Sequence, residues 1–396
     1  MNVYADNAAT TAVSETAFHA MVPFLKDLYA NPSSLHSPGQ QVKEELEKAR
    51  GIFAKYLNAA EEREIVFTSG GSEADNQALR SAAVLGARKG KRHIVSTKFE
   101  HHAILHTLKA LEKEGYEVTL LDIPADGVIT VDQVRDAIRE DTCLVTIMFA
   151  NNEIGTIQPI AEIGAVCHEK GVLFHTDAVQ AAGHLPIDVQ AMHIDMLSLS
   201  AHKFHGPKGV GVLYARRNIP LTNVIYGGGQ ERGRRAGTEN MAGICGAAAA
   251  FAEACDTMEE TNQKLLPMRD KLIAGLSKIP HSILNGDAQC RLPGNVHFCF
   301  EGIEGESLLL LLDAKGIAAS SGSACTSGDL DPSHVLLALG RPHEVAHGSL
   351  RLTFSGYNTM EEIDYILDQV PGVVEYLRNI SPVWDELEKG ERAHII

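Results

Sequence analysis

Short apolar runs alternate with segments of helical composition between residues 60 and 215. The runs are rich in Val, Ile, Leu, Phe and Thr, and they cover residues 64–69, 93–97, 116–121, 142–150, 172–177, 196–201 and 209–215. Segments 73–90 and 101–115, which lie between some of these runs, have the composition of helices. Strands that alternate with helices are typical of a parallel sheet covered on both faces. The pattern therefore predicts an α/β fold with a mostly parallel seven-stranded sheet between helices.

The pattern changes after Thr238. Residues 239–278 are rich in Ala and predict one or two long helices that connect two parts of the chain. Shorter apolar and helical segments follow, at residues 295–300, 305–316, 316–320, 349–354 and 359–379. We expect a smaller α+β domain with a terminal helix there, and a domain boundary near residue 256. A chain of 396 residues is long enough for two domains.

The amino-acid composition and the net charge limit the kinds of molecule that this protein is expected to bind. Hydrophobic residues make up 44% of the chain and charged residues 22%, which is ordinary for a folded protein and argues against disorder. The formal net charge of -16 argues against nonspecific binding to nucleic acid or to an anionic membrane, because both require a basic face. The longest aliphatic run, residues 308–312, is far shorter than the ~20 apolar residues of a membrane helix. Small molecules and other proteins remain as partners.

Cysteine usage and the first residues of the chain indicate the compartment. The seven cysteines are an odd number and include no Cys-x-x-Cys pair, so they predict neither a disulfide framework nor a structural zinc site. Residues 1–30 carry acidic and polar side chains where a signal peptide would need a basic start and an apolar run. We therefore expect a cytoplasmic protein with free thiols and no metal centre.

Polar side chains follow three of the apolar runs, where an open α/β sheet binds its ligands. Residues 68–73, TSGGSE, open a helix whose amides and dipole could hold a phosphate, although a Gly turn with a Ser cap explains the same residues. Asp177 ends the fifth run and either pairs with a protonated pyridine nitrogen or caps the next segment. Lys203 follows the sixth run, where a partly desolvated amine could form a Schiff base, although most lysines are simply solvated.

The combination of these three features predicts a pyridoxal phosphate site. Nine stretches then resemble, in order along the chain, the NifS/IscS-type cysteine desulfurases, which belong to the class V aminotransferase group of fold-type I pyridoxal phosphate enzymes. These stretches are DNAATT (6–11), NPSSLH (31–36), FTSGGSEADN (67–76), EHHAI (100–104), NNEIGT (151–156), HTDAVQ (175–180), SAHKFHGPKGVG (200–211), GGGQERGRRAGTEN (227–240) and SSGSACTSG (320–328). The resemblance extends from residue 2 to about residue 382.

The resemblance implies that the chain has two domains with different roles. A large domain, residues 14–256, would bind pyridoxal 5'-phosphate, and a small domain, residues 1–13 and 257–396, would carry the active-site cysteine loop and an arginine for the substrate carboxylate. It also implies a homodimer with shared active sites, L-cysteine as substrate, and an iron-sulfur scaffold or another sulfur-acceptor protein as partner.

Site residues follow from the resemblance position by position. Lys203 would bind the cofactor covalently, Asp177 would pair with the pyridinium nitrogen, and His101 would stack on the ring and move protons. The other cofactor contacts implied are Asn152 and Gln180 at the ring-oxygen side, Gly71, Ser72, Ser200 and His202 at the phosphate, and Thr238 at the phosphate of the other subunit. The substrate carboxylate would meet Arg351, with Asn152 nearby and Asn31 assisting.

Cys325 is the candidate sulfur acceptor. It lies in a run of small, turn-forming residues, 320–328, that cannot build a core and predicts an exposed loop. An accessible thiol on such a loop suits a group that collects sulfur as a persulfide and carries it away. The other six cysteines have apolar or helical surroundings and are expected to be small buried residues: Cys143, Cys167, Cys245, Cys255, Cys290 and Cys299.

Other functions on the same scaffold remain open at this stage. Selenocysteine lyase activity needs the same geometry, whereas a transaminase would not need a loop thiol. A protein that binds partners and keeps the cofactor only for structure is the alternative from another class, and it would not release alanine from cysteine. The sequence also leaves open whether the sulfur serves iron-sulfur assembly, nitrogenase maturation or tRNA thiolation.

Overall fold

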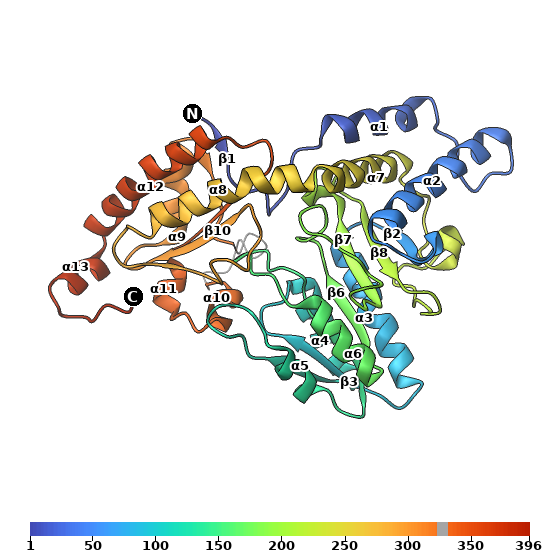
Figure 1. The fold of residues 1–396 in the computed structure, drawn as a ribbon, viewed down its shortest axis with the longest axis horizontal. Coiled ribbons are helices and arrows are strands. Elements are labelled where there is room, and N and C mark those ends of the chain that lie inside the picture. The colour runs from blue at the N-terminus through green and yellow to red at the C-terminus, as the bar shows by residue number, and fades with distance from the viewer. Residues whose placement is uncertain (323–331) are drawn as a thin grey trace.

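The computed structural model describes residues 1–322 and 332–396. Two lobes are joined by α7 (Met241–Asp256) and α8 (Met258–Leu276), which follow one another across the molecule (Figure 1). The two helices meet at Thr257, close to the predicted domain boundary. Cys325 lies outside the described residues.

The larger lobe contains a seven-stranded sheet with the order β2-β8-β7-β6-β5-β3-β4. Its strands are β2 (Ile65–Thr68), β3 (His93–Thr97), β4 (Glu117–Leu121), β5 (Thr142–Thr146), β6 (Leu173–Asp177), β7 (Met196–Ser200) and β8 (Gly211–Ala215). β8 is antiparallel to both of its neighbours, whereas the pairs from β7 to β4 are parallel. The predicted mostly parallel, seven-stranded α/β sheet is confirmed.

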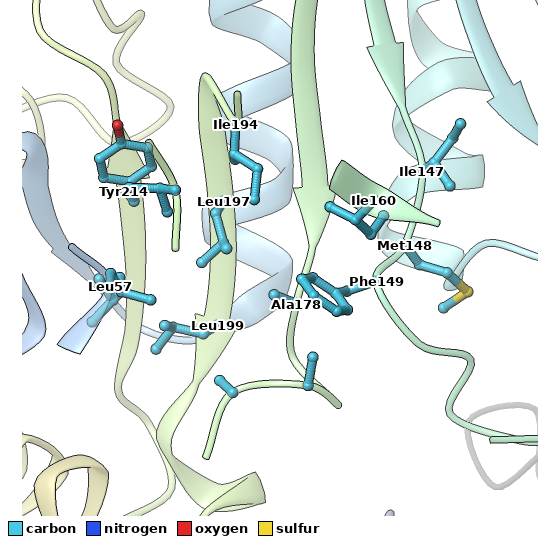
Figure 2. Close-up of a cluster of buried hydrophobic side chains, with 14 of the residues drawn as sticks. Leu57, Ile147, Met148, Phe149, Ile160, Ala178, Ile194, Leu197, Leu199 and Tyr214 are labelled. Atoms are coloured by element: carbon cyan, nitrogen blue, oxygen red, sulfur yellow. The ribbon is translucent and has the colours of Figure 1, made fainter. Parts of the chain in front are cut away.

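Helices cover both faces of this sheet because successive strand residues point to opposite sides. On β7, Leu197 packs in one hydrophobic core and Met196 in another. The helices and short 3-10 turns of this lobe are α1 (Glu15–Lys26), α2 (Ser37–Tyr56), η1 (Glu62–Glu64), α3 (Gly71–Ala87), α4 (His102–Lys113), α5 (Val131–Ala137), α6 (Ile160–Lys170), η2 (Ala201–Lys203) and η3 (Gln230–Gly233). Figure 2 shows part of the first core, where Leu197 and Leu199 lie in the same cluster as Leu57 and Phe149.

The smaller lobe contains a three-stranded antiparallel sheet, β12-β10-β9, and a parallel pair, β1-β11. Its elements are β1 (Val3–Tyr4), β9 (Ser282–Leu284), β10 (Asn295–Phe300), α9 (Gly305–Ala314), β11 (Ile317–Ala318), α10 (His334–Ala338), α11 (His343–His347), β12 (Ser349–Thr353), α12 (Met360–Asn379) and α13 (Pro382–Glu388). Val3 and Ala5 pack in the same core as Phe298 and Ile363. The chain therefore starts in this lobe and then enters the larger one.

Among the described residues of the smaller lobe, five short elements were not predicted: β1, β9, α10, α11 and α13. Each is two to seven residues long. Helices this short are held by tertiary packing rather than by their own periodicity, so the sequence pattern does not show them. Within the two described ranges, no helix is both long and apolar enough to cross a lipid bilayer.

Helix α9 offers a matched test of the smaller core. Leu312 is fully buried and Leu310 is 66% exposed, although both lie in the same helix. We expect Leu312→Ala to lower the free energy of unfolding by about 2–5 kcal/mol, because it removes buried methyl groups and leaves a cavity. Leu310→Ala should change it by less than about 0.5 kcal/mol. Urea unfolding of both variants measures this, and equal losses would contradict the assigned core.

Candidate active site

The carboxyl ends of β6 and β7 meet the N-termini of α3 and α4 at one edge of the large sheet. This is the edge at which open α/β sheets bind their ligands. Asp177 is the last residue of β6, and Lys203 ends the short turn η2 that follows β7. His101 caps the N-terminus of α4. The fold thus gathers residues that are up to 102 positions apart in the sequence, from His101 to Lys203.

The Asp177 carboxylate is buried. Its Oδ1 atom accepts a hydrogen bond of 2.9 Å from the backbone N–H of Val179. Burial raises the pKa of Asp177 to about 6, although the Val179 hydrogen bond and the positive charge of Lys203 act in the opposite direction. A carboxylate with so few local donors is suited to a cationic partner.

Asp75 of α3 lies beside this carboxylate. Ligand atoms of Asp75, His101 and Asp177 all lie within 4.8 Å of one another. Burial, followed by the charge of Asp177, raises the pKa of Asp75 well above its usual value. His175 of β6 is close to the same group, with its Nε2 atom 3.7 Å from Asp75 Oδ1 and 3.0 Å from Ser198 Oγ.

His101 is neutral near pH 7. Burial and the charge of Lys203 lower the pKa of His101 to about 4. Its Nδ1 atom accepts a hydrogen bond of 3.2 Å from the backbone N–H of Ala103, which closes the first turn of α4. A neutral ring that accepts at Nδ1 carries its proton at Nε2. His101 therefore presents an Nε2–H group that can donate a hydrogen bond.

Lys203 reaches across to the N-terminal segment. Its Nζ atom donates hydrogen bonds to the backbone oxygens of Ala8, at 2.5 Å, and Ala9, at 2.8 Å. Gln180 Nε2 also donates to the Ala8 oxygen, at 3.0 Å. His202 Nδ1 lies 3.1 Å from Thr10 Oγ1. Three of the predicted site residues, Gln180, His202 and Lys203, therefore contact the DNAATT motif.

The N-terminus of α3 lies against the same edge of the sheet. A Cβ atom on Gly71 would come within 2.7 Å of Val179 Cγ2 and 3.6 Å of Ser200 Cβ, so the lack of a side chain allows this close packing. The first amides of a helix have no intrahelical acceptor and attract anions. Gly71, Ser72 and Ser200 are thus arranged around a helix start that can bind a phosphate.

Arg351 of β12 comes from the smaller lobe. Its Nη2 atom donates to Asp6 Oδ1 at 2.7 Å, and its Nη1 atom donates to the backbone oxygen of Asn152 at 2.9 Å. The side chain is 2% exposed, and its Nε atom has no hydrogen-bond partner within residues 1–322 and 332–396. A buried guanidinium with an unused donor is suited to a carboxylate ligand.

Two predicted site residues, Asn31 and Thr238, are exposed. Asn31 is exposed between α1 and α2, and its Oδ1 atom accepts from the Ser33 N–H at 2.8 Å. Figure 1 shows the α1–α2 connection at the opposite end of the molecule from β10, the strand that pairs with β12. Asn31 and Arg351 therefore do not meet within one chain.

The expectation of buried cysteines is wrong for Cys290. This thiol is exposed in the loop after β9, because Asp287 accepts hydrogen bonds from the Gln289 and Cys290 amides and holds the turn at the surface. Cys143, Cys167 and Cys299 are buried, whereas Cys245 and Cys255 are half-buried.

All six described thiols are poor thiolates. Burial raises the pKa of each of them, to about 11 for Cys143 and about 12 for Cys245, Cys255 and Cys299. The pKa is also raised for Cys167 and Cys290. Since the thiolate is the nucleophilic form, none of these six is suited to attack sulfur at neutral pH.

Sequence reasoning missed Asp6, Asp75 and Glu100. Burial raises the pKa of Glu100 to about 8, and its Oε1 atom accepts from the Met148 N–H at 3.1 Å. A signal for Asp75 was present, because helix spacing places it on the same face as Ala78, Leu79 and Ala82. No comparable periodicity marks Asp6 or Glu100, whose roles depend on contacts between distant segments.

Asp75, His101 and Asp177 could in principle coordinate a metal ion, because two carboxylates and an imidazole are common ligands. Lys203 argues against that use. Its positive charge acts on both His101 and Asp177 and would repel a divalent metal ion more strongly than a monovalent organic cation. An organic cation held by hydrogen bonds, next to a lysine that can bind it covalently, fits the same residues better.

Comparisons with known proteins agree with this geometry. The chain matches the model of the Aminotransferase class-V family over residues 3–366. The cysteine desulfurase IscS of Clostridium botulinum (strain Hall) is 53% identical over 392 residues, which are 98% of each chain. The cysteine desulfurase NifS of Azotobacter vinelandii is 47% identical over 384 residues, which are 97% of this chain and 95% of that one.

A solved structure of a NifS-like protein superimposes with a TM-score of 0.89 at 38% identity, and the match covers 95% of this chain and all of that one. The chain therefore belongs to the class V aminotransferase family. Within that family it is of the NifS/IscS type, as the motif resemblance implied.

The raised pKa of Asp177 predicts how the cofactor-free protein responds to pH. Because its folded-state pKa, about 6, lies above the usual 3.8, the folded protein holds the proton more tightly than the unfolded chain. The contribution of Asp177 to stability therefore falls as the pH rises from about 4 to about 6. Asp177→Asn should remove this part of the pH dependence, so the variant loses less stability over that window.

Urea unfolding of the apoprotein at several pH values measures the difference. Asp368→Asn, which changes an exposed carboxylate on α12, is the matched control and should retain the wild-type pH dependence. Identical pH profiles for Asp177→Asn and the wild type would contradict a destabilising buried carboxylate.

Proposed function

We propose that this chain is a cysteine desulfurase, which converts L-cysteine to L-alanine and keeps the sulfur as a persulfide on Cys325. The observation that carries the proposal is the placement of Lys203, His101 and a buried Asp177 at one sheet edge, with Arg351 entering from the smaller lobe. The near full-length similarity to proteins named cysteine desulfurase supports the same activity. Residues 14–256 are proposed as the cofactor-binding domain, and residues 1–13 with 257–396 as the small domain.

The residues present fit pyridoxal phosphate. Asp177 is buried, accepts a hydrogen bond from the Val179 N–H, and would accept another from a protonated ring nitrogen. Lys203 supplies the amine that would bind the cofactor covalently. Asn152 and Gln180 are proposed at the ring-oxygen side. Bound pyridoxal phosphate would act as an electron sink that weakens first the Cα–H bond and then the Cβ–S bond of the substrate.

The phosphate is proposed to lie at the N-terminus of α3. Gly71 and Ser72 offer backbone amides and a hydroxyl there, and Ser200 and His202 face the same edge of the sheet. Glu73 does not repel the phosphate strongly, because its Oε1 atom accepts from Arg235 Nε at 2.9 Å. Burial opposes ionisation of Glu73, but the hydrogen bonds from Arg235 and Ser69 outweigh it and lower the pKa. The helix dipole adds a favourable field for an anion.

Arg351 is proposed to bind the substrate carboxylate. Its Nε donor is buried and has no hydrogen-bond partner among the described residues, whereas Nη2 donates to Asp6 at 2.7 Å and Nη1 to the Asn152 oxygen at 2.9 Å. A substrate carboxylate could therefore accept a hydrogen bond from this Nε group. This contact would fix the amino acid with its reacting carbons toward His101 and Lys203, and it selects an α-amino acid over a simple amine.

His101 and Lys203 are proposed to handle protons. The Lys203 amine, when it is not bound to the cofactor, would be placed to remove the substrate α-proton. His101 is neutral at physiological pH and can donate from Nε2 or accept a proton when the leaving group requires it. His101 and Lys203 are half-buried beside the buried Asp177, so these transfers are proposed to take place between groups of fixed position.

Sulfur transfer then needs a thiolate that the described residues do not provide. In the proposed step, the Cys325 thiolate attacks substrate Sγ, a new S–S bond forms, and the substrate Cβ–Sγ bond breaks. The electron pair of the broken bond goes to the carbon skeleton, which takes up a proton and leaves as L-alanine. The net reaction converts L-cysteine and a thiol to L-alanine and a persulfide, so no external oxidant or reductant is needed.

We also propose a homodimer with shared active sites. Helix α1 packs on α7 through Ala17 and presents Phe18, Val22 and Leu25 outward, at 52%, 41% and 66% exposure. These residues are spaced at i, i+4 and i+7 and so form one apolar face, which is typical of a surface that another chain covers. In such a dimer, Thr238 would reach the phosphate of the other subunit, and Asn31 would act across the interface.

The proposed persulfide must pass to another protein, because a sulfane sulfur left on the enzyme blocks the next turnover. An iron-sulfur scaffold or another sulfur-acceptor protein is the proposed partner. We also propose a cytoplasmic location, because all six cysteines in the described part of the chain are free thiols that form no disulfide.

The role of Cys325 can be separated from that of the cofactor. Cys325→Ala should keep its bound pyridoxal phosphate and its yellow colour, because Asp177 and Lys203 are unchanged. Its alanine release from cysteine should fall by roughly 10³-fold or more, as on removal of other catalytic nucleophiles. In the unmodified protein, cysteine without reductant should add the mass of one sulfur atom to the Cys325 peptide, and dithiothreitol should remove it.

Cys290→Ala is the matched control, because Cys290 is the exposed thiol among those described. It should retain full activity and the sulfur label. A label on Cys290, or normal alanine release by Cys325→Ala, would show that another group accepts the sulfur. Absence of colour in the wild type after addition of pyridoxal phosphate would instead refute the cofactor.

If the apolar face of α1 forms the dimer interface, a charge introduced on that face should weaken the dimer. The wild type should have twice the mass of one chain in solution. Leu25→Asp should weaken the dimer by about 2 kcal/mol or more, roughly 30-fold in dissociation constant, because it buries an unpaired charge. Leu310→Asp, at the same 66% exposure in the smaller lobe, is the control. Sedimentation equilibrium measures both, and a fully active wild-type monomer would exclude shared sites.

A further inference from the structure

A second group of convergent side chains lies at the outer side of the smaller lobe. His281 directly precedes β9, Glu301 directly follows β10, and His394 lies in the segment after α13. The Glu301 N–H donates to the His281 oxygen at 3.0 Å, so the two strand ends are joined. The C-terminal segment folds back against this lobe, as Figure 1 shows. None of the three residues belongs to the active site proposed above.

Their potential ligand atoms point at a common position. His394 Nδ1 lies 2.9 Å and His281 Nδ1 lies 3.5 Å from the same atom, Glu301 Oε2. The ligand atoms of all three residues lie within 4.8 Å of one another. The backbone oxygen of Ile396 is 2.5 Å from His281 Nδ1 and adds a fourth oxygen or nitrogen atom to the group.

We propose that His281, Glu301 and His394 bind a divalent transition-metal ion, for which Zn²⁺ is the suitable probe. Two imidazole nitrogens and one carboxylate are ligands that Zn²⁺ prefers. Ligands at about 2.0–2.1 Å from a tetrahedral ion are separated from each other by about 3.3–3.5 Å. The 3.5 Å separation of His281 Nδ1 and Glu301 Oε2 already matches this value, whereas the 2.9 Å separation of His394 Nδ1 and Glu301 Oε2 must widen when the ion binds.

The carboxylate at the centre of the group is held in place. Glu301 is 4% exposed, and its Oε1 atom accepts from the Ile395 N–H at 2.7 Å, which leaves Oε2 directed at the two imidazoles. Arg378 fixes the surrounding backbone, because Nε donates to the Glu301 oxygen at 3.0 Å and Nη2 donates to the His281 oxygen at 2.9 Å. A ligand that is oriented by its neighbours loses little entropy when it binds an ion.

The two histidines can adapt to an ion. Their rings are stacked, with centroids 3.7 Å apart and planes inclined by 16°. Because an ion lies in the plane of each imidazole that binds it, the rings must rotate out of this stacked arrangement, and side-chain exposures of 32% and 33% leave room for the rotation. Each neutral ring must also carry its proton at Nε2, so the hydrogen bonds from Nδ1 to oxygen are replaced by bonds to the ion.

Trp384 lies next to the proposed metal site, so its fluorescence can report on metal binding. Trp384 is the only tryptophan of the chain, and its ring centroid lies 5.5 Å from that of His281 and 5.4 Å from that of His394. Arg378 lies 4.0 Å above the same indole. A Cβ atom on Gly302 would come within 2.5 Å of Trp384 Cε3, and Gly302 has φ +82°, so the indole packs directly on the backbone next to Glu301.

Zn²⁺ titration of the holoenzyme, first treated with a chelator, tests the proposal through Trp384 emission. We expect a saturable change at one Zn²⁺ per chain and no change with Mg²⁺, which prefers an all-oxygen set. His394→Ala should move the midpoint to at least roughly tenfold higher Zn²⁺, because it removes a ligand. Zn²⁺ should also raise the melting temperature of the wild type but not that of the variant.

His168→Ala is the matched control. His168 stacks on His193 with ring centroids 4.7 Å apart and the same 16° inclination, but these two rings are not part of either three-ligand group found in the described ranges. This variant should keep the wild-type midpoint. Bound zinc, counted by atomic emission in a Cys325→Ala background so that the proposed active-site thiol does not contribute, should fall by one ion per chain in His394→Ala.

Two outcomes would overturn the proposal. One is a Trp384 emission that does not respond to excess Zn²⁺. The other is a His394→Ala variant that keeps the wild-type Zn²⁺ titration midpoint and binds the wild-type amount of zinc. The three side chains would then serve only to hold the C-terminal segment by hydrogen bonds. Glu301→Gln offers a second variant, since the amide keeps the Ile395 hydrogen bond but is a poor zinc ligand. It should lose Zn²⁺ affinity as well.

Discussion

The buried carboxylate of Asp177 is the constraint around which the proposed active site is organised. Burial opposes its ionisation, and burial together with the charge of Asp177 also raises the pKa of two further acids, Asp75 and Glu100. Such a cluster is stable with negative charge only when cations compensate it. Lys203 is one such cation, and the proposed pyridinium nitrogen is another. The need for a positive partner therefore explains why the cofactor would bind here and in one orientation.

The N-terminal segment completes this site by joining the two lobes. Asp6 pairs with Arg351 of the smaller lobe, while the backbone oxygens of Ala8 and Ala9 accept from Lys203 of the larger one. Thr10 and Thr11 contact His202. One short strand in the smaller lobe thus fixes the position of a loop that reaches the lysine. Arg351 and Lys203, for which we propose substrate and cofactor binding, are consequently held by the same six residues.

Burial disfavours the charged form of the cysteine thiols, as it does for the buried carboxylic acids. Burial disfavours the thiolate at each of the six described cysteines, just as it disfavours the ionised form of Asp177. Reactivity is therefore suppressed throughout the core. Cys325 was recognised by its surroundings in the sequence, a run of Ser and Gly that cannot form a core, rather than by any property of the thiol itself.

The sequence by itself determined the sheet and predicted the principal residues of the proposed site. Strand runs and helical segments are set by local periodicity, and the polar residues at strand ends can be read without knowing which strands are neighbours, as for Asp177 and Lys203. Tertiary structure alone decided that Asp6 would hold Arg351, that Asn31 would lie away from it, and that Cys290 would be exposed. It also brought His281 and His394 onto Glu301, although 113 positions separate the two histidines. These features depend on contacts between distant segments, and no local pattern of hydrophobic and polar residues encodes such contacts.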